Sequence, residues 1–324
     1  MKRPDRTGDR APFKEPEVSR IGLGLAALGR PIYLTDRRSD ALGAPRERTI
    51  EAMRSRTFEV LDAAWDLGIR FFDLAPSYGR AEEFMGAWLA ARPTRRAEVT
   101  ISSKWGYEYV AGWDPNARVH ERKEHSLAML EKQWPETQSA LGSAPDFHLV
   151  HSVTPESPAV SDAALLRRLR EMVSKGTRVG LSTSGAHQAD TIDSALSLPS
   201  SPYSAVQTTW NILERSAQHS LEAAADNGWL VVVKEAMANG RLATGGFPDV
   251  DRIATTARIT SDALAIGAVL KNDWAHIVLS GAVTRAQLES NASARPLLTD
   301  ISALDRLVIP PDKYWSERSK RVWS

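Results

Sequence analysis

Short apolar runs alternate with longer amphipathic stretches along most of the chain, starting near Arg20. Such alternation is typical of strand and helix units arranged around a parallel sheet. The eight runs predicted to be strands span residues 20–24, 70–74, 98–104, 146–151, 177–182, 203–207, 229–234 and 276–280. We therefore expect an α/β fold in which eight strands alternate with helices.

Apolar spacing also predicts where the intervening helices end. Three helical patterns stop directly before Gly68, Gly176 and Gly228, and glycine is the preferred residue just beyond a helix C-terminus. A fourth helical pattern follows Ser261 and Asp262, either of which is a suitable N-terminal cap.

A closed barrel and an open doubly wound sheet both show this alternation. They differ after the first strand, where an open dinucleotide-binding sheet normally carries a G-x-G-x-x-G turn. Here Gly22 and Gly24 are followed by Ala27 instead of a third glycine. We therefore predict a single (β/α)8 TIM barrel.

The domain organisation follows from the same pattern. Residues 1–18 are expected to form a flexible arm, and residues 19–324 a single barrel domain with a C-terminal tail. From Ile309 the tail is predicted to be irregular and to pack on the barrel through Trp315 or Trp323.

Charge and composition narrow the classes of function. The 41 basic and 40 acidic residues leave a net charge of +1 without an extended basic run, so nucleic acid is not an expected partner. No segment approaches the ~20 apolar residues of a membrane span, and a cytoplasmic protein is the simplest expectation. Because the chain has no cysteine, any chemistry must come from other side chains or from a cofactor.

Four polar residues lie where predicted strands end, which is where the active sites of such barrels are found. Asp73, Lys104 and His151 each close a strand, and Tyr78 follows Asp73 by five positions. Taken singly, each has an ordinary structural explanation, such as a turn-forming aspartate or a core histidine. Together they predict one active site, because adjacent parallel strands place their ends around a common opening.

These side chains suit acid–base chemistry on a carbonyl group. An aspartate keeps a buried lysine charged, and that charge is expected to lower the pKa of Tyr78 below its usual ~10, so that it can act as a general acid. His151 can donate a hydrogen bond to a carbonyl oxygen. His148 lies on the opposite face of the strand, which argues against a paired-histidine metal site. The missing hydride donor implies a bound cofactor.

The pattern formed by Asp73, Ala75, Tyr78, Lys104 and His151 resembles that of the aldo-keto reductases, in the same order and spacing. The resemblance runs from about residue 18 to residue 291. It implies that Tyr78 is the general acid, that Asp73 and Lys104 tune it, and that His151 orients the substrate oxygen, without a metal ion.

The resemblance also implies cofactor and substrate positions. Ser182 and Gln207 correspond to residues that hold the nicotinamide carboxamide, and the segment from Gly281 to Asn291 to one that holds the adenosine. The full predicted cofactor set is Gly24, Leu25, Asp73, Ser182, Thr183, Gln207, Lys234, Ala236, Asn239, Arg241, Gly281, Arg285, Gln287 and Asn291. Tyr78, Trp105 and His151 are the predicted substrate contacts. The aromatic residues Trp105, Tyr107, Tyr109 and Trp113 either line the pocket or pack on the barrel rim.

The chain departs from the family pattern at two places. Lys234 and Glu235 replace a nicotinamide-stacking aromatic residue and the serine after it, and they are expected to form an ion pair. The usual basic residues at the positions of Gly281 and Gln287 are absent. Arg285 is the remaining cation of that segment, so the hypothesis is NADP(H) binding with Arg285 on the 2′-phosphate, while NAD(H) stays possible.

The resemblance therefore implies an NAD(P)H-dependent oxidoreductase acting on an aldehyde, a ketone or the corresponding alcohol. An NAD-dependent aldose dehydrogenase on the same fold is one alternative. A non-catalytic regulatory subunit that binds a nicotinamide nucleotide is another. The expected partner is a small carbonyl compound or sugar; the physiological substrate, its direction of reaction and the oligomeric state stay open.

Overall fold

The computed structural model describes residues 19–33, 41–297 and 302–321. Eight parallel strands close into a barrel in the order β1-β10-β9-β8-β7-β6-β3-β2. Their bounds are β1 Ile21–Gly24, β2 Phe71–Asp73, β3 Thr100–Trp105, β6 Phe147–Val153, β7 Arg178–Thr183, β8 Tyr203–Thr209, β9 Leu230–Lys234 and β10 Ile277–Ser280. The predicted (β/α)8 barrel is thereby confirmed, with every strand within about two residues of its expected place at either end.

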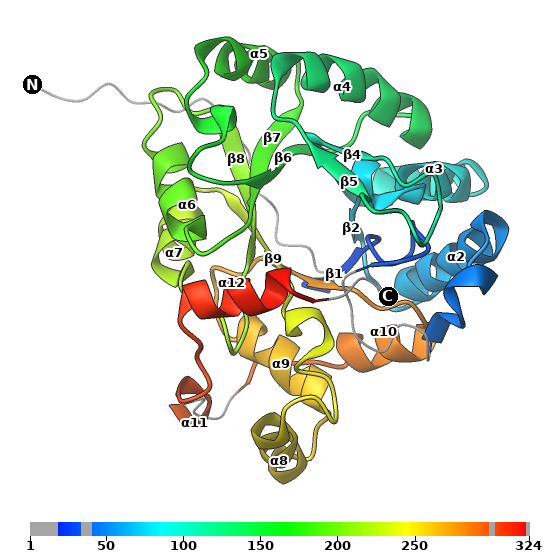
Figure 1. Cartoon of the computed structure of the whole chain (residues 1–324), viewed down its shortest axis with the longest axis vertical. Coiled ribbons are helices and arrows are strands. Elements are labelled where there is room, and N and C mark those ends of the chain that lie inside the picture. Colours follow the sequence, from blue (N-terminus) through cyan, green and yellow to red (C-terminus); the bar gives the residue numbers. More distant parts are fainter. Residues whose placement is uncertain (1–18, 34–40, 298–301, 322–324) are drawn as a thin grey trace, which may run out of the picture.

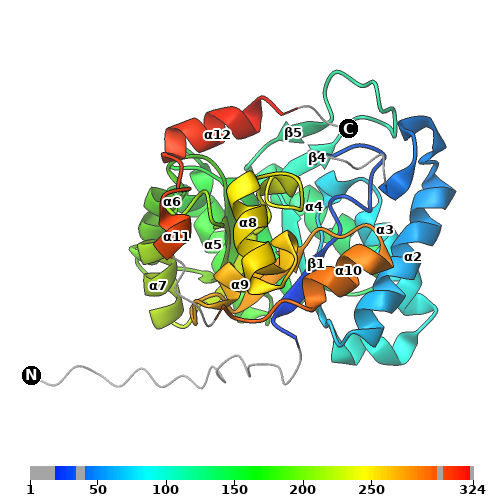
Figure 2. The same ribbon diagram turned by 90° about the horizontal axis from the view of Figure 1, so that it is seen from below.

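Helices surround the barrel, which Figure 1 shows end-on. They are α2 Ile50–Asp66, α3 Ala81–Ala90, α4 Leu127–Leu141, α5 Ala163–Ser174, α6 Gln188–Leu196, α7 Gln218–Asp226, α8 Pro248–Ala257, α9 Ser261–Leu270, α10 Arg285–Ala292, α11 Ser302–Asp305 and α12 Pro311–Ser319. The hairpin β4 Tyr107–Tyr109 and β5 Glu121–Lys123 and the helix α12 lie at the same end of the barrel (Figure 2). Short 3-10 turns include η2 Pro76–Tyr78 and η5 Ala238–Gly240.

Local sequence explains several helix ends. Gly68 follows α2 with a φ of 76°, the left-handed conformation that glycine adopts without a steric penalty, as predicted. The predicted cap of α9 is wrong by one position. Thr260, rather than Ser261 or Asp262, is the N-cap, because its hydroxyl accepts a hydrogen bond from the Ala263 N–H at 3.3 Å.

The tail is more regular than expected, because residues after Pro310 form the helix α12. Pro311 occupies the first helical position, where its missing N–H costs nothing. Trp315 is 8% exposed and packs in an apolar cluster with Leu264 of α9 and Leu304 of α11, which confirms its predicted anchoring role. The predicted arm, residues 1–18, and Trp323 lie outside the described residues.

The alternation of side chains along β6 sets which histidine reaches the barrel mouth. His148 packs outward against Trp134 of α4, with ring centres 4.9 Å apart. His151, three residues later, projects to the opposite side, as the pleat of a strand requires.

Within the described part of the chain, no single helix is long and apolar enough to span a membrane. The helices α8 and α9 pass that test of length and composition only as a pair, which is bent by 83°.

Candidate active site

The polar residues predicted at strand ends meet at one end of the barrel. Lys104 is fully buried, and its Nζ donates to Asp73 Oδ2 at 2.6 Å and to the Leu74 carbonyl at 2.9 Å. The other Asp73 carboxylate oxygen accepts from Gln207 Nε2 at 2.7 Å, across the barrel from β8. The Lys104 nitrogen also lies 4.7 Å from the centre of the Tyr78 ring. The structure thus joins β2, β3 and β8 through one buried hydrogen-bonded network, and the Tyr78 ring of η2 lies beside it.

Close backbone packing fixes the position of Tyr78. A Cβ added at Gly29 would lie 2.1 Å from the Tyr78 carbonyl oxygen, and Gly79 adopts a φ of 65°. The Arg80 N–H then donates to the Gly29 carbonyl at 2.8 Å. Because only glycine permits this approach, the loop after β1 and η2 hold the tyrosine in one place.

The pKa of Tyr78 shifts in the direction opposite to the expectation. Burial, with a further contribution from the negative charge of Asp73, raises it well above its ordinary value. The predicted lowering by Lys104 is wrong, because burial has the largest effect on the Tyr78 pKa and the Lys104 ammonium group donates its hydrogen bonds to Asp73 and Leu74. Tyr78 therefore keeps its proton near neutral pH, which is the form that a general acid needs.

His151 lies beside Tyr78, with the two rings edge to face and their centres 5.5 Å apart. Burial, with a contribution from the charge of Lys104, lowers the pKa of His151 well below its ordinary value, so the imidazole is neutral. Its Nδ1 is 3.4 Å from the Ser77 hydroxyl. Nε2 is then the nitrogen that remains for a ligand, and as an N–H it can donate to an oxygen atom.

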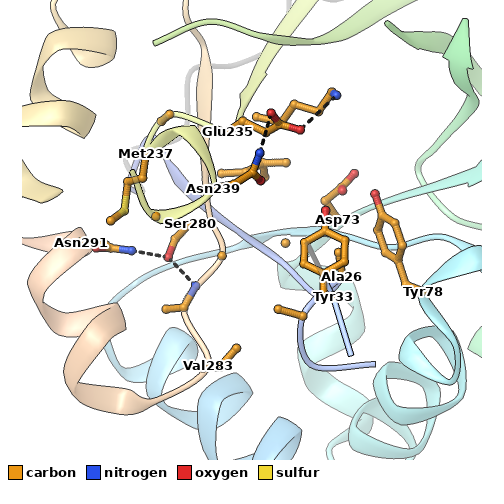
Figure 3. Close-up of a pocket in the computed structure, with 18 of the residues that line it drawn as sticks. Ala26, Tyr33, Asp73, Tyr78, Glu235, Met237, Asn239, Ser280, Val283 and Asn291 are labelled. Atoms are coloured by element: carbon orange, nitrogen blue, oxygen red, sulfur yellow. Dashed lines mark hydrogen bonds and ion pairs between the residues drawn. The ribbon is translucent and has the colours of Figure 1, made fainter. Parts of the chain in front are cut away.

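These residues open into a cavity of about 710 Å³, within the usual range of small-molecule sites. Figure 3 shows it extending from Tyr78 and Asp73 on one side to Ser280 and Asn291 on the other. We call these the tyrosine end and the α10 end. The predicted residues that line the cavity are Gly24, Asp73, Tyr78, His151, Gln207, Lys234, Ala236, Asn239, Gly281, Gln287 and Asn291.

Side chains at the α10 end are held by short-range hydrogen bonds. Asn291, which is 4% exposed, donates to the Ser280 hydroxyl at 2.8 Å. Gln287 Oε1 accepts from the Val283 N–H at 2.9 Å. Nothing lies within 4 Å of a Cβ built at Gly281, so the backbone there is open to the cavity.

Two predicted carboxamide ligands on β7 lie outside the lining of the cavity. Ser182 is buried and accepts from the Ser152 N–H at 2.7 Å, and the Thr183 hydroxyl lies 2.5 Å from that of Thr208. The pairing of β6 with β7 shifts in register just before β6 ends, and Ser152 adopts a φ of 52° at that point. Ser152, which lies at this irregularity, and Ser184, which directly follows β7, line the cavity instead. Leu25 is likewise fully buried and is absent from the lining.

The aromatic residues after Lys104 were predicted either to line the pocket or to pack on the barrel rim, and they divide between these two positions. Tyr107 lines the cavity, with its ring centre 4.9 Å from that of His151. Trp105, a predicted substrate contact, is fully buried beside His125 and is not in the lining. Tyr109 is likewise absent from the lining, and Trp113 donates to a backbone carbonyl of the rim.

Arg285, the residue predicted to bind the 2′-phosphate, does not line the cavity. Its guanidinium contacts Asp66 of α2 at 2.9 Å and Glu289 at 3.4 Å, and the side chain is 52% exposed and outside the cavity lining. Two carboxylates therefore draw it away from the α10 end. Arg241, also predicted, contacts Glu317 of α12 at 3.3 Å and does not line the cavity either.

The predicted pairing of Lys234 with Glu235 is part of a larger buried cluster. Their charged atoms are 3.9 Å apart, while Arg318 of α12 contacts both oxygens of Glu235, at 2.9 Å and 2.5 Å. Burial would raise the pKa of Glu235, but the charges of Arg318 and Lys234 lower it to about 2. Burial lowers the pKa of Lys234 to about 8. Asn239 donates to Glu235 at 3.0 Å, as Figure 3 shows.

Several lining residues were not predicted. They include Arg30, Glu121, Ser184, Asp262, Ser280 and Arg318. Ser280 directly precedes the predicted Gly281 at the end of β10, so its place beside the site was a usable signal. Arg318 and Asp262 come from segments far from any strand end, and nothing in their local sequence points to the cavity.

The fold and the site define a class: an eight-stranded parallel barrel whose polar cluster lies at the C-terminal ends of the strands, the active-site end of barrel enzymes. The sequence profile of the Aldo/keto reductase family matches residues 42–308. The chain therefore belongs to the aldo-keto reductases, a family of oxidoreductases.

Individual relatives support this membership at modest similarity. Aldo-keto reductase YhdN of Bacillus subtilis (strain 168) is 27% identical over 233 residues, which are 70% of this chain and 60% of that protein. D-threo-aldose 1-dehydrogenase of Pseudomonas sp is 35% identical over 96 residues, or 28% of this chain and 25% of that protein. The chain thus spans less than two thirds of each of these relatives.

Solved structures show the same fold. The aldo-keto reductase AKR11C1 from Bacillus halodurans, in its holo form, superposes with a TM-score of 0.64 at 19% identity, covering 94% of this chain and 93% of that one. The glycerol dehydrogenase AKR11B4 from Gluconobacter oxydans gives a TM-score of 0.63 at 19% identity, with the same coverage.

Proposed function

We propose that this chain transfers a hydride between a nicotinamide dinucleotide and the carbonyl carbon of a small aldehyde or ketone, or runs the reverse oxidation of the alcohol. The observation that carries the proposal is the buried Tyr78, which lies beside Lys104 and His151 at one end of an elongated cavity.

The donor set of the cavity fits a dinucleotide. At the tyrosine end, Gln207 offers an amide to the carboxamide group, and a Cβ built at Gly24 meets no atom closer than 3.7 Å, so the backbone there has open space beside it. At the α10 end, Gly281 lies four residues before the eight-residue helix α10, and Asn291 lies in the last turn of that helix. Free N–H groups and the positive end of the helix dipole favour phosphate there.

When bound, the nicotinamide ring supplies the hydride to the carbonyl carbon. Tyr78 gives its proton to the carbonyl oxygen as the carbon–oxygen double bond becomes a single bond. His151 donates a hydrogen bond to the same oxygen and aligns it. Lys104, held by Asp73 at 2.6 Å, stabilises the phenolate that remains until a proton returns from solvent. In the oxidation direction Tyr78 accepts the proton instead.

Oxidation of an aldose is the second candidate function. The local similarity to D-threo-aldose 1-dehydrogenase favours it, and Tyr78 would then remove the proton of the anomeric hydroxyl. The intact set of Asp73, Tyr78, Lys104 and His151 argues against a purely regulatory protein. Parallel assays of carbonyl reduction and aldose oxidation separate the two candidate substrates.

The substitution Tyr78→Phe tests the proposal, because it removes the proton donor and keeps the ring. We expect kcat to fall about 10²- to 10⁴-fold while nucleotide affinity changes less than threefold. Tyr203→Phe is the matched control, since its hydroxyl contacts only the Ala159 carbonyl, away from the cavity. If Tyr78→Phe kept more than about a tenth of the activity, or if neither nucleotide bound, the proposal would fail.

A further inference from the structure

The α10 end of the cavity differs in charge from the tyrosine end. The cations that line the cavity within the described residues are Arg30, Lys234 and Arg318. Arg30 contacts Glu121 at 2.6 Å and lies over the Tyr78 ring, and the other two contact Glu235. All three therefore belong to the tyrosine end or to the Glu235 cluster.

No cation within the described residues lines the α10 end. Arg285, the nearest in sequence, is held outside by Asp66 and Glu289. The polar side chains that line this end include Ser280 after β10, Gln287, Ser290 and Asn291 of α10, and Asp262 of α9. The only formal charge among them is negative.

Asp262 is suited to contact a ligand. It lies in the first turn of α9, which packs against α10, and the Thr260 hydroxyl before it is 3.5 Å from the Ser290 hydroxyl. Its carboxylate makes no hydrogen bond or ion pair with another described residue, although it is only partly exposed. A carboxylate in this position accepts hydrogen bonds from hydroxyl or amino groups and repels phosphate.

We propose that Asp262 makes the α10 end selective for a dinucleotide without a 2′-phosphate, so that the chain prefers NAD(H) to NADP(H). This inference rests on the proposed function, which places the reacting ring at the tyrosine end and hence the adenosine at the α10 end. A 2′-phosphate carries nearly two negative charges and needs a cation, whereas free ribose hydroxyls need only acceptors. The earlier hypothesis of NADP(H) read by Arg285 is replaced by this assignment.

The test measures the dissociation constants of NADH and NADPH by quenching of protein fluorescence, for wild type and three variants. Wild type should bind NADH at least about tenfold more tightly. Asp262→Asn should reduce that preference at least threefold, mainly by improving NADPH binding. Asp262→Asn combined with Gln287→Arg, which adds a cation at the same end, should reverse the preference.

Asp190→Asn is the control, because Asp190 is also a first-turn acid, in α6, but does not line the cavity. Asp190→Asn should leave the ratio of the NADH and NADPH dissociation constants unchanged. Asp262→Asn would also leave it unchanged if Asp262 only stabilised the N-terminus of α9. Equal or tighter NADPH binding by wild type, or an unchanged ratio in Asp262→Asn, would overturn the inference and leave the proposed function standing. Absence of saturation by both nucleotides would instead refute the proposed function itself.

Discussion

Glu82 is a buried carboxyl group directly behind the active site. It is 7% exposed on α3 and accepts a hydrogen bond from the Ser103 hydroxyl at 2.5 Å, one residue before Lys104. Burial raises its pKa from 4.5 to about 7, although the hydrogen bond from Ser103 and the charge of Lys104 oppose the shift. The group therefore takes up a proton on folding wherever the pH lies between these two values.

This pKa shift predicts a pH-dependent stability. The native state binds more protons than the unfolded state between about pH 4.5 and 7, so the contribution of Glu82 to the free energy of unfolding falls as the pH rises through that range. Glu82→Gln keeps an acceptor for Ser103 and removes the titration. Its stability relative to wild type should rise by about 2 to 3 kcal/mol from pH 4.5 to pH 8.

Urea unfolding at several pH values measures this difference. Glu171→Gln, an exposed carboxyl group on α5, serves as control and should run parallel to wild type. A Glu82→Gln curve that also runs parallel to wild type would show that Glu82 titrates normally in the folded protein.

At the residue scale, the sequence predicted those residues of the candidate active site that stand at the ends of strands. Asp73, Lys104 and His151 each follow a recognisable apolar run, so their convergence could be foreseen. The direction of the Tyr78 pKa shift could not, because it is set mainly by burial, which the local sequence does not show. The fate of Arg285 could not either, since Asp66 lies 219 residues away in sequence.

At the element scale, α12 connects the C-terminal region to the active site. Arg318 on this helix is 22% exposed and contacts Glu235, which is 8% exposed and lines the cavity. Glu235 has a φ of 56° at the end of β9, an uncommon conformation for this residue type. The ion pair therefore holds both the helix and an unusual stretch of backbone in place.

We predict that Arg318→Met destabilises the protein by about 2 to 4 kcal/mol, because it leaves a buried carboxylate without its main partner. Adding Glu235→Gln to Arg318→Met should recover at least half of that loss, since the uncompensated charge is gone. Chemical unfolding of the two single variants and the double variant gives the coupling. A double variant with the sum of both single losses would contradict a direct ion-pair role.

The α12 helix and the cap of α9 show what the element patterns could not predict. Only Tyr314 and Trp315 are buried in α12, too few to form a legible helical period. For α9, Thr260, Ser261 and Asp262 are three consecutive residues that can all cap a helix. Thr260 is the N-cap in the structure, so the Asp262 carboxylate does not cap the helix and lies at the cavity.

At the scale of the whole molecule, the barrel could be predicted because eight apolar runs alternate with amphipathic helices, a pattern that few folds share. Which strand-end residues face the cavity depends on the register between strands, which the sequence does not encode locally. Near the irregular pairing at the end of β6, Ser152 and Ser184 line the cavity and Ser182 does not. Of the predicted cofactor residues, Leu25, Ser182 and Thr183 therefore lie outside the lining, whereas the predicted catalytic residues Asp73, Tyr78 and His151 lie within it.

We propose that a hydride passes from the nicotinamide ring to a carbonyl carbon in this cavity while Tyr78 supplies the proton. The most direct test incubates the protein with NADH or NADPH carrying two deuterium atoms at C4, together with a broad panel of aldehydes and ketones, and analyses the products by mass spectrometry. We predict an alcohol with one deuterium on its carbinol carbon for wild type, and a yield at least a hundredfold lower for Tyr78→Phe. No deuterated alcohol from any compound, or an equal yield from the variant, would contradict the account.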